Sequence, residues 1–365
     1  MHIPYFSIQN LFQQYGPQIN RIAQEVWSSG SYFDEALTSE FEQVLAESSL
    51  RKYAVTVGSC TDALFFSLKA LDVQAGDRVL VPAVSFIATV TPVLRSGAIP
   101  IFCDIVPETG LADLNHVETL IKRHQPKVAM LVDLYGNLFE PSDIHHLEAQ
   151  YDIPFLLDAA QSIGAVRSGA KAGSVGRMSC FSFDPTKVIH GFGSGGAVLT
   201  DDPGLAARVR SLRYHGKVKK EHLEPGYNSR MNTLQIELLH LQLSQLSTIV
   251  NDRNETAVRF LQALQHAPSI TPLSSQNDLQ NFHKFVVLCN DRALVQSHLE
   301  SKGIQSMVHY PQPLFFHPLF EKVPFIAENI DAAPAFCGRV LSLPLHPFMD
   351  PDQVAFLCQT LKELK

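Results

Sequence analysis

The stretch Cys180-Phe-Ser-Phe-Asp-Pro-Thr-Lys187-Val-Ile-His-Gly-Phe-Gly-Ser-Gly-Gly196 decides how the rest of the chain is interpreted. Its apolar beginning around Ser182 predicts a strand packed on both faces, and Lys187 follows just beyond a Pro turn. Four glycines in the last six residues allow the backbone to pass close to a flat ligand or a second chain. Burial lowers the pKa of a lysine, and an unprotonated amine forms Schiff bases. Lys187 is therefore a candidate for amine chemistry, although a lone loop lysine is more often solvated and inert.

The composition is that of an ordinary globular protein of 365 residues, with 45% hydrophobic and 18% charged residues, which is long enough for two domains. A net charge of -7 argues against a nucleic-acid surface because no basic excess is available to neutralise phosphates. The six cysteines lack the spacing of a metal site or redox pair. The chain has no apolar run of membrane-spanning length and no signal-peptide pattern. We therefore expect a cytoplasmic protein without a metal, a membrane anchor or a nucleic-acid partner.

Predicted strands alternate with predicted helices over the first two thirds of the chain, which indicates an α/β fold. We expect a large domain over residues 1–245, with an N-terminal helical segment and a mostly parallel sheet covered by helices on both faces. A single long helix from about 233 to 264 would lead into a smaller C-terminal α+β domain over residues 246–365. The strands expected are 53–57, 78–82, 99–103, 128–132, 154–157 and 197–200 in the large domain and 284–289, 304–308 and 340–343 in the small one.

Ligands of parallel α/β sheets bind beyond the carboxyl ends of the strands. This rule predicts one rim that holds Ser59, Thr61, Asp104, Asp133 and Asp158, which all follow predicted strands. The hydroxyl residues after the first strand start a helix, where free N–H groups and the helix dipole favour an anion. Plain capping of that helix by Ser59 or Thr61 explains the same residues equally well.

Asp158 and Lys187 together suggest a cofactor. Pyridoxal 5′-phosphate (PLP) is held by a lysine that binds its aldehyde and a carboxylate that keeps its ring nitrogen protonated. Asp158 lies at the end of a predicted strand on the expected rim, and Ser59, Thr61 and Ser182 offer donors for a phosphate. Spacing alone leaves PLP as one of several hypotheses.

The order of short motifs identifies a family. The chain resembles the PLP-dependent nucleotide-sugar aminotransferases, the DegT/StrS group within the aspartate-aminotransferase fold type (PLP fold type I), over nearly its whole length. The motifs that carry this resemblance are Ser59-Cys-Thr-Asp-Ala-Leu64, Ala75-Gly-Asp-Arg-Val79, Phe86-Ile-Ala-Thr89, Gly97-Ala-Ile-Pro-Ile-Phe-Cys-Asp104, Leu134-Tyr-Gly136, Asp158-Ala-Ala-Gln161, Phe181-Ser-Phe183 with Lys187, Asn228-Ser-Arg230, His309-Tyr-Pro311 and Ser342-Leu-Pro344.

The resemblance implies a transamination from an amino acid, most often L-glutamate, to a nucleotide-linked keto sugar, in nucleotide-sugar and polysaccharide biosynthesis. It makes Lys187 the cofactor-bound lysine and proton shuttle and makes Asp158 the partner of the pyridinium nitrogen. Gln161 would contact the ring hydroxyl, and Phe86 would stack on the ring unless it is a plain core residue.

The same resemblance assigns the phosphate to Ser182 and the Cys60-Thr61 turn. Asn228 would reach the phosphate of the partner subunit, so the active unit would be a homodimer with shared sites. His309 and Tyr310 would lie toward the sugar pocket, although a purely structural role for them is equally plausible from the sequence.

Several positions depart from the family pattern and affect the substrate more than the cofactor. The family often has Gly, His, Asn and His where this chain has Cys60, Ile163, Val188 and Phe315. Three alternatives remain: a sugar dehydratase of the same fold, a non-catalytic regulator and a cysteine desulfurase. Lys187 argues against the dehydratase, because that branch carries His at this position. The complete set of Lys187, Asp158 and Gln161 argues against the regulator, which would not need it. A desulfurase would need a reactive cysteine on a mobile loop, whereas Cys180 is expected to be buried.

Overall fold

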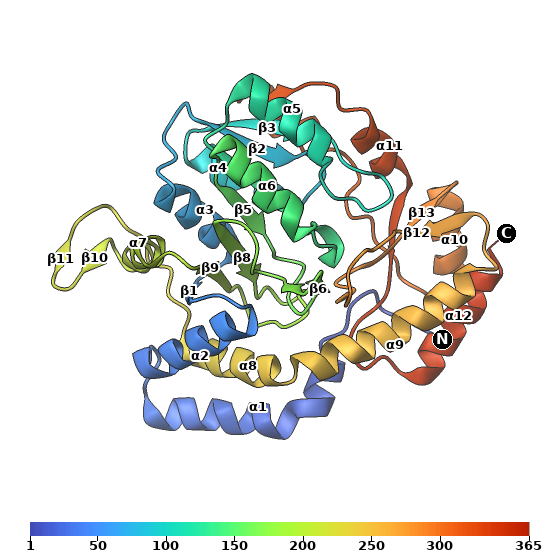
Figure 1. The fold of residues 1–365 in the computed structure, drawn as a ribbon. Coiled ribbons are helices and arrows are strands. Elements are labelled where there is room, and N and C mark those ends of the chain that lie inside the picture. Colours follow the sequence, from blue (N-terminus) through green and yellow to red (C-terminus); the bar gives the residue numbers. More distant parts are fainter. Residues whose placement is uncertain (365) are drawn as a thin grey trace.

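In a computed structural model that describes residues 1–364, a central eight-stranded sheet is covered by helices on both faces (Figure 1). The sheet is parallel from β8 to its β14 edge, and β9 runs antiparallel to both β1 and β8. The expected mostly parallel sheet is therefore confirmed. Its strands, in spatial order, are β1 (Tyr53–Val57), β9 (Gly196–Thr200), β8 (Met178–Ser182), β5 (Phe155–Asp158), β4 (Val128–Val132), β2 (Arg78–Pro82), β3 (Ile99–Cys103) and β14 (Ile326–Ala327).

Alternation of side chains along each strand builds two cores from one sheet. In β2, Val79 and Val81 pack toward one helical layer, whereas Leu80 packs toward the opposite one. The first layer consists of α3 (Cys60–Ala70), α4 (Thr91–Arg95) and α7 (Pro203–Arg213). The opposite layer contains α5 (Leu114–His124) and α6 (Pro141–Tyr151). Because both faces are covered, the strands are mostly apolar, as buried parallel strands are.

Three helices extend the second layer over β1, β8 and β9. They are α1 (Gln9–Ser29), α2 (Glu35–Ser48) and α8 (Thr233–Ser244). The prediction of a single helix from 233 to 264 is wrong in one respect. The helix breaks at Gln245, whose φ and ψ of -106° and 8° are not helical. The chain continues as α9 (Leu246–Leu264), which reaches across to the C-terminal part of the molecule (Figure 1).

The C-terminal part contains a separate three-stranded antiparallel sheet of β12 (Ile270–Pro272), β13 (Phe285–Cys289) and β15 (Val340–Leu343). It packs with α9, α10 (Arg292–Ser301) and α12 (Pro351–Lys362) around one core. β14 leaves this part and pairs with β3 of the large sheet. The domain division at residue 245 stays a prediction.

The expected strand at 304–308 is not formed. Only isolated pairings occur there, with Ile304 beside Ile3 and Met307 beside Ser342. After β2 the chain forms a single 3₁₀ turn at Ile87–Thr89, which is followed by α4. The remaining elements are α11 (Ala332–Arg339), the paired strands β6 (Val166–Arg167) and β7 (Ala170–Lys171), the hairpin β10 (Lys217–Val218) and β11 (Glu221–His222), and short helical turns at Leu134–Gly136, Leu314–Phe316 and Pro318–Glu321. Among residues 1–364, no helix combines the length and apolar character needed to cross a bilayer.

Candidate functional site

A cavity of about 550 Å³ lies beyond the carboxyl ends of β5 and β8, where the parallel-sheet rule expects a ligand. Segments from distant parts of the sequence line it. All of the predicted site residues except Asn228 lie on its wall: Cys60, Thr61, Phe86, Asp158, Gln161, Ser182, Lys187, His309 and Tyr310. Their individual roles stay predictions.

Lys187 enters the cavity from the turn after β8. β8 is buried along its whole length, as expected of the run before Lys187, and the Lys187 N–H donates to the Asp184 carbonyl to close the turn. Burial lowers the pKa of the Lys187 amine, and the negative charge of Asp158 only partly opposes this. A lysine with a depressed pKa has a larger fraction of the unprotonated amine that attacks a carbonyl carbon.

Asp158 ends β5 and presents its carboxylate to the same cavity. The Thr89 hydroxyl donates to Oδ2 over 2.7 Å, and the Ala160 N–H donates to Oδ1 over 3.2 Å. Burial raises the pKa of the Asp158 carboxyl, and both hydrogen bonds oppose that effect. Ser85 Oγ lies 2.7 Å from Thr89 Oγ1. Since the single Thr89 proton goes to Asp158, Ser85 must donate to Thr89.

The N-terminus of α3 faces the cavity through Ser59, Cys60 and Thr61. Ser59 is the N-cap, and its hydroxyl accepts from the Asp62 N–H over 3.1 Å. The N–H groups of Cys60 and Thr61 have no acceptor within the helix, and the helix dipole adds partial positive charge there. The capping and anion-binding interpretations of this turn are therefore compatible. A Cβ on Gly196 would lie 2.6 Å from the Cys60 nitrogen, so only glycine lets β9 approach the turn this closely.

Position 191 requires glycine because of a different neighbour. A Cβ there would lie 1.8 Å from Gln235 Oε1, so this glycine makes room for α8. Gly191 and Gly196 therefore allow close approach within the chain itself, and Gly195 lines the cavity; the expected approach to a flat ligand or a second chain stays a prediction.

Gln161, Tyr310 and Phe86 lie together on the cavity wall. Gln161 Oε1 accepts from the Tyr135 N–H over 2.9 Å, and its Nε2 donates to the Tyr310 hydroxyl over 3.4 Å. The rings of Phe86 and Tyr310 lie 6.2 Å apart at an angle of 30°. Phe86 is 56% exposed, which rules out its alternative as a core residue and leaves its face open to the cavity.

Asn228 lies outside the cavity of its own chain. It is exposed and pairs with Tyr214 in the loop that carries the β10–β11 hairpin. This hairpin projects from the body of the molecule (Figure 1). The contact of Asn228 to the phosphate of a partner subunit stays a prediction.

Sequence reasoning missed Tyr5, Phe6, His283 and Lys284, which also line the cavity. Tyr5 and Phe6 arrive because Ile3 pairs beside Ile304, almost the whole chain away. No local pattern in the sequence announces such a pairing. His283 and Lys284 directly precede β13. A lysine immediately before an apolar strand is a sequence feature from which Lys284 could have been named as a candidate site residue.

Asp104 and Asp133 follow strands on the same side of the sheet but do not join the cavity lining. Asp104 instead accepts the N–H groups of Asp331, Ala332 and Ala333 and thereby caps α11. Asp133 accepts from the Ser162 hydroxyl over 2.9 Å, and burial raises its pKa to about 7.

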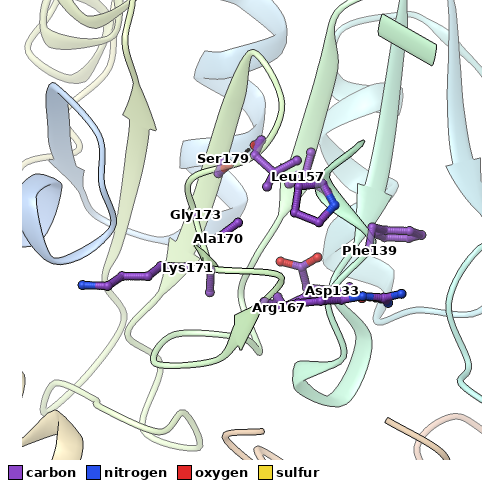
Figure 2. Close-up of a pocket in the computed structure, with 12 residues that line it drawn as sticks. Asp133, Phe139, Leu157, Arg167, Ala170, Lys171, Gly173 and Ser179 are labelled. Atoms are coloured by element: carbon purple, nitrogen blue, oxygen red, sulfur yellow. Dashed lines mark hydrogen bonds between the residues drawn. The ribbon is translucent and has the colours of Figure 1, made fainter. Parts of the chain in front are cut away.

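Figure 2 shows a second and much smaller cavity of about 10 Å³ beside Asp133, with Leu157, Arg167 and Ser179 on its wall. This volume corresponds to about one water molecule. Substrate chemistry therefore belongs to the larger cavity and not to this one.

The residues of the large cavity fit pyridoxal 5′-phosphate. They supply an amine for its aldehyde carbon (Lys187), a buried carboxylate for its ring nitrogen (Asp158) and a helix N-terminus with hydroxyls for its phosphate. The close approach of Gly196 to the backbone of Ser59 and Cys60 shows that β9 packs directly against this helix N-terminus.

Comparison with known proteins identifies relatives that match almost the whole chain. The model of the DegT/DnrJ/EryC1/StrS aminotransferase family matches residues 13–362. The erythromycin biosynthesis sensory transduction protein EryC1 of Saccharopolyspora erythraea is 33% identical over 99% of each chain. The UDP-2-acetamido-2-deoxy-3-oxo-D-glucuronate aminotransferase of Pseudomonas aeruginosa is 31% identical over 98% of this chain and 99% of its own. The crystal structure of S. venezuelae DesV in complex with a ketimine intermediate has a TM-score of 0.94 at 30% identity, covering 99% of this chain and 98% of that chain.

Proposed function

Because the chain belongs to the DegT/DnrJ/EryC1/StrS aminotransferase family and is a PLP-dependent aminotransferase, we propose that it moves an amino group from L-glutamate to a nucleotide-linked keto sugar. The observation that carries the proposal is that the Lys187 amine and the buried Asp158 carboxylate line the same cavity. The P. aeruginosa relative is named for an acceptor of this class, a 3-oxo sugar on UDP.

The proposed roles follow from the environment of each side chain. Bound PLP supplies an electron-withdrawing ring and an aldehyde carbon that accepts an amine. Lys187 would hold the cofactor and, once released by the amino donor, would move the proton from the donor Cα to the cofactor carbon that carried the aldehyde. In the second half of the reaction it delivers a proton to the sugar carbon that receives the amine. Asp158 holds a proton on the ring nitrogen, and Thr89 keeps the Asp158 carboxylate oriented and ionised.

We infer that Gln161 binds the ring hydroxyl, that Phe86 covers one ring face and that Ser182 and the Cys60-Thr61 turn bind the phosphate. Their positions on the cavity wall support these roles. His309 and Tyr310 lie at the sugar side, where His309 Nδ1 is 3.0 Å from Ser342 Oγ. Burial and the nearby lysines lower the pKa of His309 to about 3, so it would act as a neutral hydrogen-bonding group.

We further propose a homodimer in which Asn228 completes the phosphate site of the partner subunit. The exposure of Asn228 and the projecting β10–β11 hairpin support this arrangement, since a two-stranded hairpin is marginally stable by itself and a second chain can stabilise it. Work in the cytoplasm fits the six free cysteines, which a reducing compartment preserves.

The alternatives have less support. Lys187 itself argues against the dehydratase, because that branch carries His at the position. Cys180 is fully buried and lies 3.4 Å from Ser67 Oγ, which does not suit a mobile desulfurase cysteine. The EryC1 relative is named for sensory transduction, and the complete Lys187, Asp158 and Gln161 set argues against a purely regulatory role here.

An absorbance experiment tests the proposed function. The purified protein with PLP should show a band near the visible edge that shifts toward the ultraviolet when L-glutamate is added. Lys187→Ala should bind PLP without the covalent band and lose turnover, and Lys187→Arg, which keeps the charge, should behave in the same way. Normal turnover in either variant, or no PLP binding by the wild type, would contradict the proposal.

A further inference from the structure

Lys284 is a second lysine in the cavity, and the proposed mechanism does not use it. It stands between the loop at Phe282 and the first residue of β13, and its side chain lines the cavity. Its Nζ lies 5.1 Å from the centre of the Tyr5 ring. Tyr5 in turn lies 5.6 Å from the His309 ring, so Lys284 belongs to the side of the cavity assigned to the substrate.

The backbone that presents Lys284 is held firmly. The buried Arg253 guanidinium donates to the carbonyls of Asn281, Phe282 and His283. The next residue, Phe285, is buried and pairs with Leu343 of the neighbouring strand. A cation placed by such a framework is preorganised for a ligand rather than free to move toward solvent.

The charge around Lys284 is unbalanced. Among residues 1–364 no carboxylate lies within ion-pair distance of its Nζ. Burial first, and then the positive charges of Lys187 and Arg253, lower its pKa to about 7. Asp184 opposes this shift only weakly. A partly buried amine with cationic neighbours gains most from an incoming anion.

The rest of the wall offers few other cations. No arginine lines the cavity in the described part of the chain, and burial holds the pKa of His283 and His309 far below neutrality. Lys187 is committed to the cofactor under the proposed function. An anionic group on a substrate therefore meets Lys284 as the available cation of this chain.

Resting on the proposed function, we propose that Lys284 binds a carboxylate of a substrate of this aminotransferase. Two substrates can supply this group: the amino-acid donor, or an acceptor sugar that is a uronic acid. Lys284 then determines specificity: it favours substrates with a carboxylate at this position over neutral analogues of the same size.

Unreactive ligands test the proposal without turnover. Glutarate represents the donor and D-glucuronate represents the sugar acid, and both are titrated calorimetrically into the PLP-loaded protein. Lys284→Met should weaken the binding of at least one of them by about 10- to 100-fold, the range for a hydrogen bond to a charged group, whereas Lys284→Arg should retain most of it. The matched control is Lys122→Met, because Lys122 also lies over a tyrosine ring, at 5.8 Å from Tyr151, but on the exposed surface of α5.

Proton uptake gives an independent readout. Because burial depresses the pKa of the unliganded Lys284 amine, a bound carboxylate should draw in a fraction of a proton at pH 8, measured by titration in buffers of different ionisation enthalpy. Lys284→Met should lower that uptake. Dependence of glutarate binding on Lys284 assigns the donor carboxylate, and dependence of glucuronate binding assigns the sugar acid.

Equal affinity of the wild type and Lys284→Met for both ligands overturns the proposal, as does the absence of binding to the wild type. Failure of the proposed function would appear differently, as a PLP band that no amino acid changes, whether or not the carboxylates bind.

Discussion

The hydrogen bond from Thr89 to Asp158 allows a quantitative prediction. Thr89→Val keeps the shape of the side chain and deletes one 2.7 Å hydrogen bond to a buried carboxylate. A hydrogen bond to a charged group contributes about 1.5–3 kcal/mol, which corresponds to about one to two units in the pKa of Asp158. The carboxylate would then hold the ring proton less well. We expect the first half-reaction with L-glutamate to slow by about 10- to 100-fold.

Stopped-flow absorbance measures this rate directly, since the cofactor reports its own conversion. Ser85→Ala is the matched control because Ser85 donates to Thr89 and not to Asp158. Its loss of a neutral hydrogen bond of about 0.5–1.5 kcal/mol should slow the reaction by less than about 10-fold. A Thr89→Val rate within twofold of the wild type, or a Ser85→Ala defect larger than that of Thr89→Val, would refute the reasoning.

The same variant has a signature in stability against pH in the cofactor-free protein. Burial raises the folded-state pKa of Asp158 above its unfolded value, and the Thr89 hydrogen bond opposes that shift. Thr89→Val should raise the folded pKa further. The extra destabilisation should be complete above the new folded pKa, where the carboxylate is ionised in both proteins, and should disappear below the folded pKa of the wild type, where the carboxyl is protonated in both folded proteins. Thermal unfolding at a series of pH values measures it.

Three further predictions concern assembly, capping and the buried thiol. A mixture of inactive Lys187→Ala and Asn228→Ala proteins, unfolded and refolded together, should regain about a quarter of wild-type activity, because half of the dimers are mixed and half of their sites are intact; no recovery would argue against shared sites. Asp104→Ala should cost about 2 kcal/mol in denaturant unfolding, since it uncaps α11, and should leave the glutamate half-reaction unchanged; a rate defect in the folded protein would place Asp104 in the site after all. Cys180→Ala should retain that half-reaction, and the wild type should release no sulfide from L-cysteine; sulfide release that requires Cys180 would revive the desulfurase.

The sheet was largely predictable because buried parallel strands are short apolar runs bounded by polar residues and glycine. The ranges expected for β1, β2, β3, β4 and β15 agree with the structure. The helix α5 was missed, although Asp113 caps it and Val117, Leu120 and Ile121 recur at helical spacing. The break at Gln245 was not predictable from the pattern, since apolar residues continue on both sides of it.

The site was predictable where it lies on consecutive motifs and not where tertiary pairing creates it. Asp158, Gln161, Ser182 and Lys187 follow directly from β5 and β8. The strand-end rule applied equally to Asp104, but the structure uses that carboxylate to cap α11, and the sequence does not say which helix will arrive there. The contact between Lys284 and Tyr5 could not be predicted either, because the two residues lie 279 positions apart in the sequence.

The pairing of Ile3 beside Ile304 also sets an order of events during synthesis and folding. Ile3 is fully buried there, and the Tyr5 N–H donates to Gln305 across 300 positions of sequence. Closing so long a loop is entropically costly and late, so Ile3 and Tyr5 cannot take their places until the chain around Ile304 and Gln305 is available. The cavity wall on β5 and β8, to which we assign the cofactor, can form from residues 1–200, whereas the wall that includes Tyr5, Lys284 and His309 cannot. A nascent or refolding chain should therefore acquire its cofactor before it acquires its selectivity.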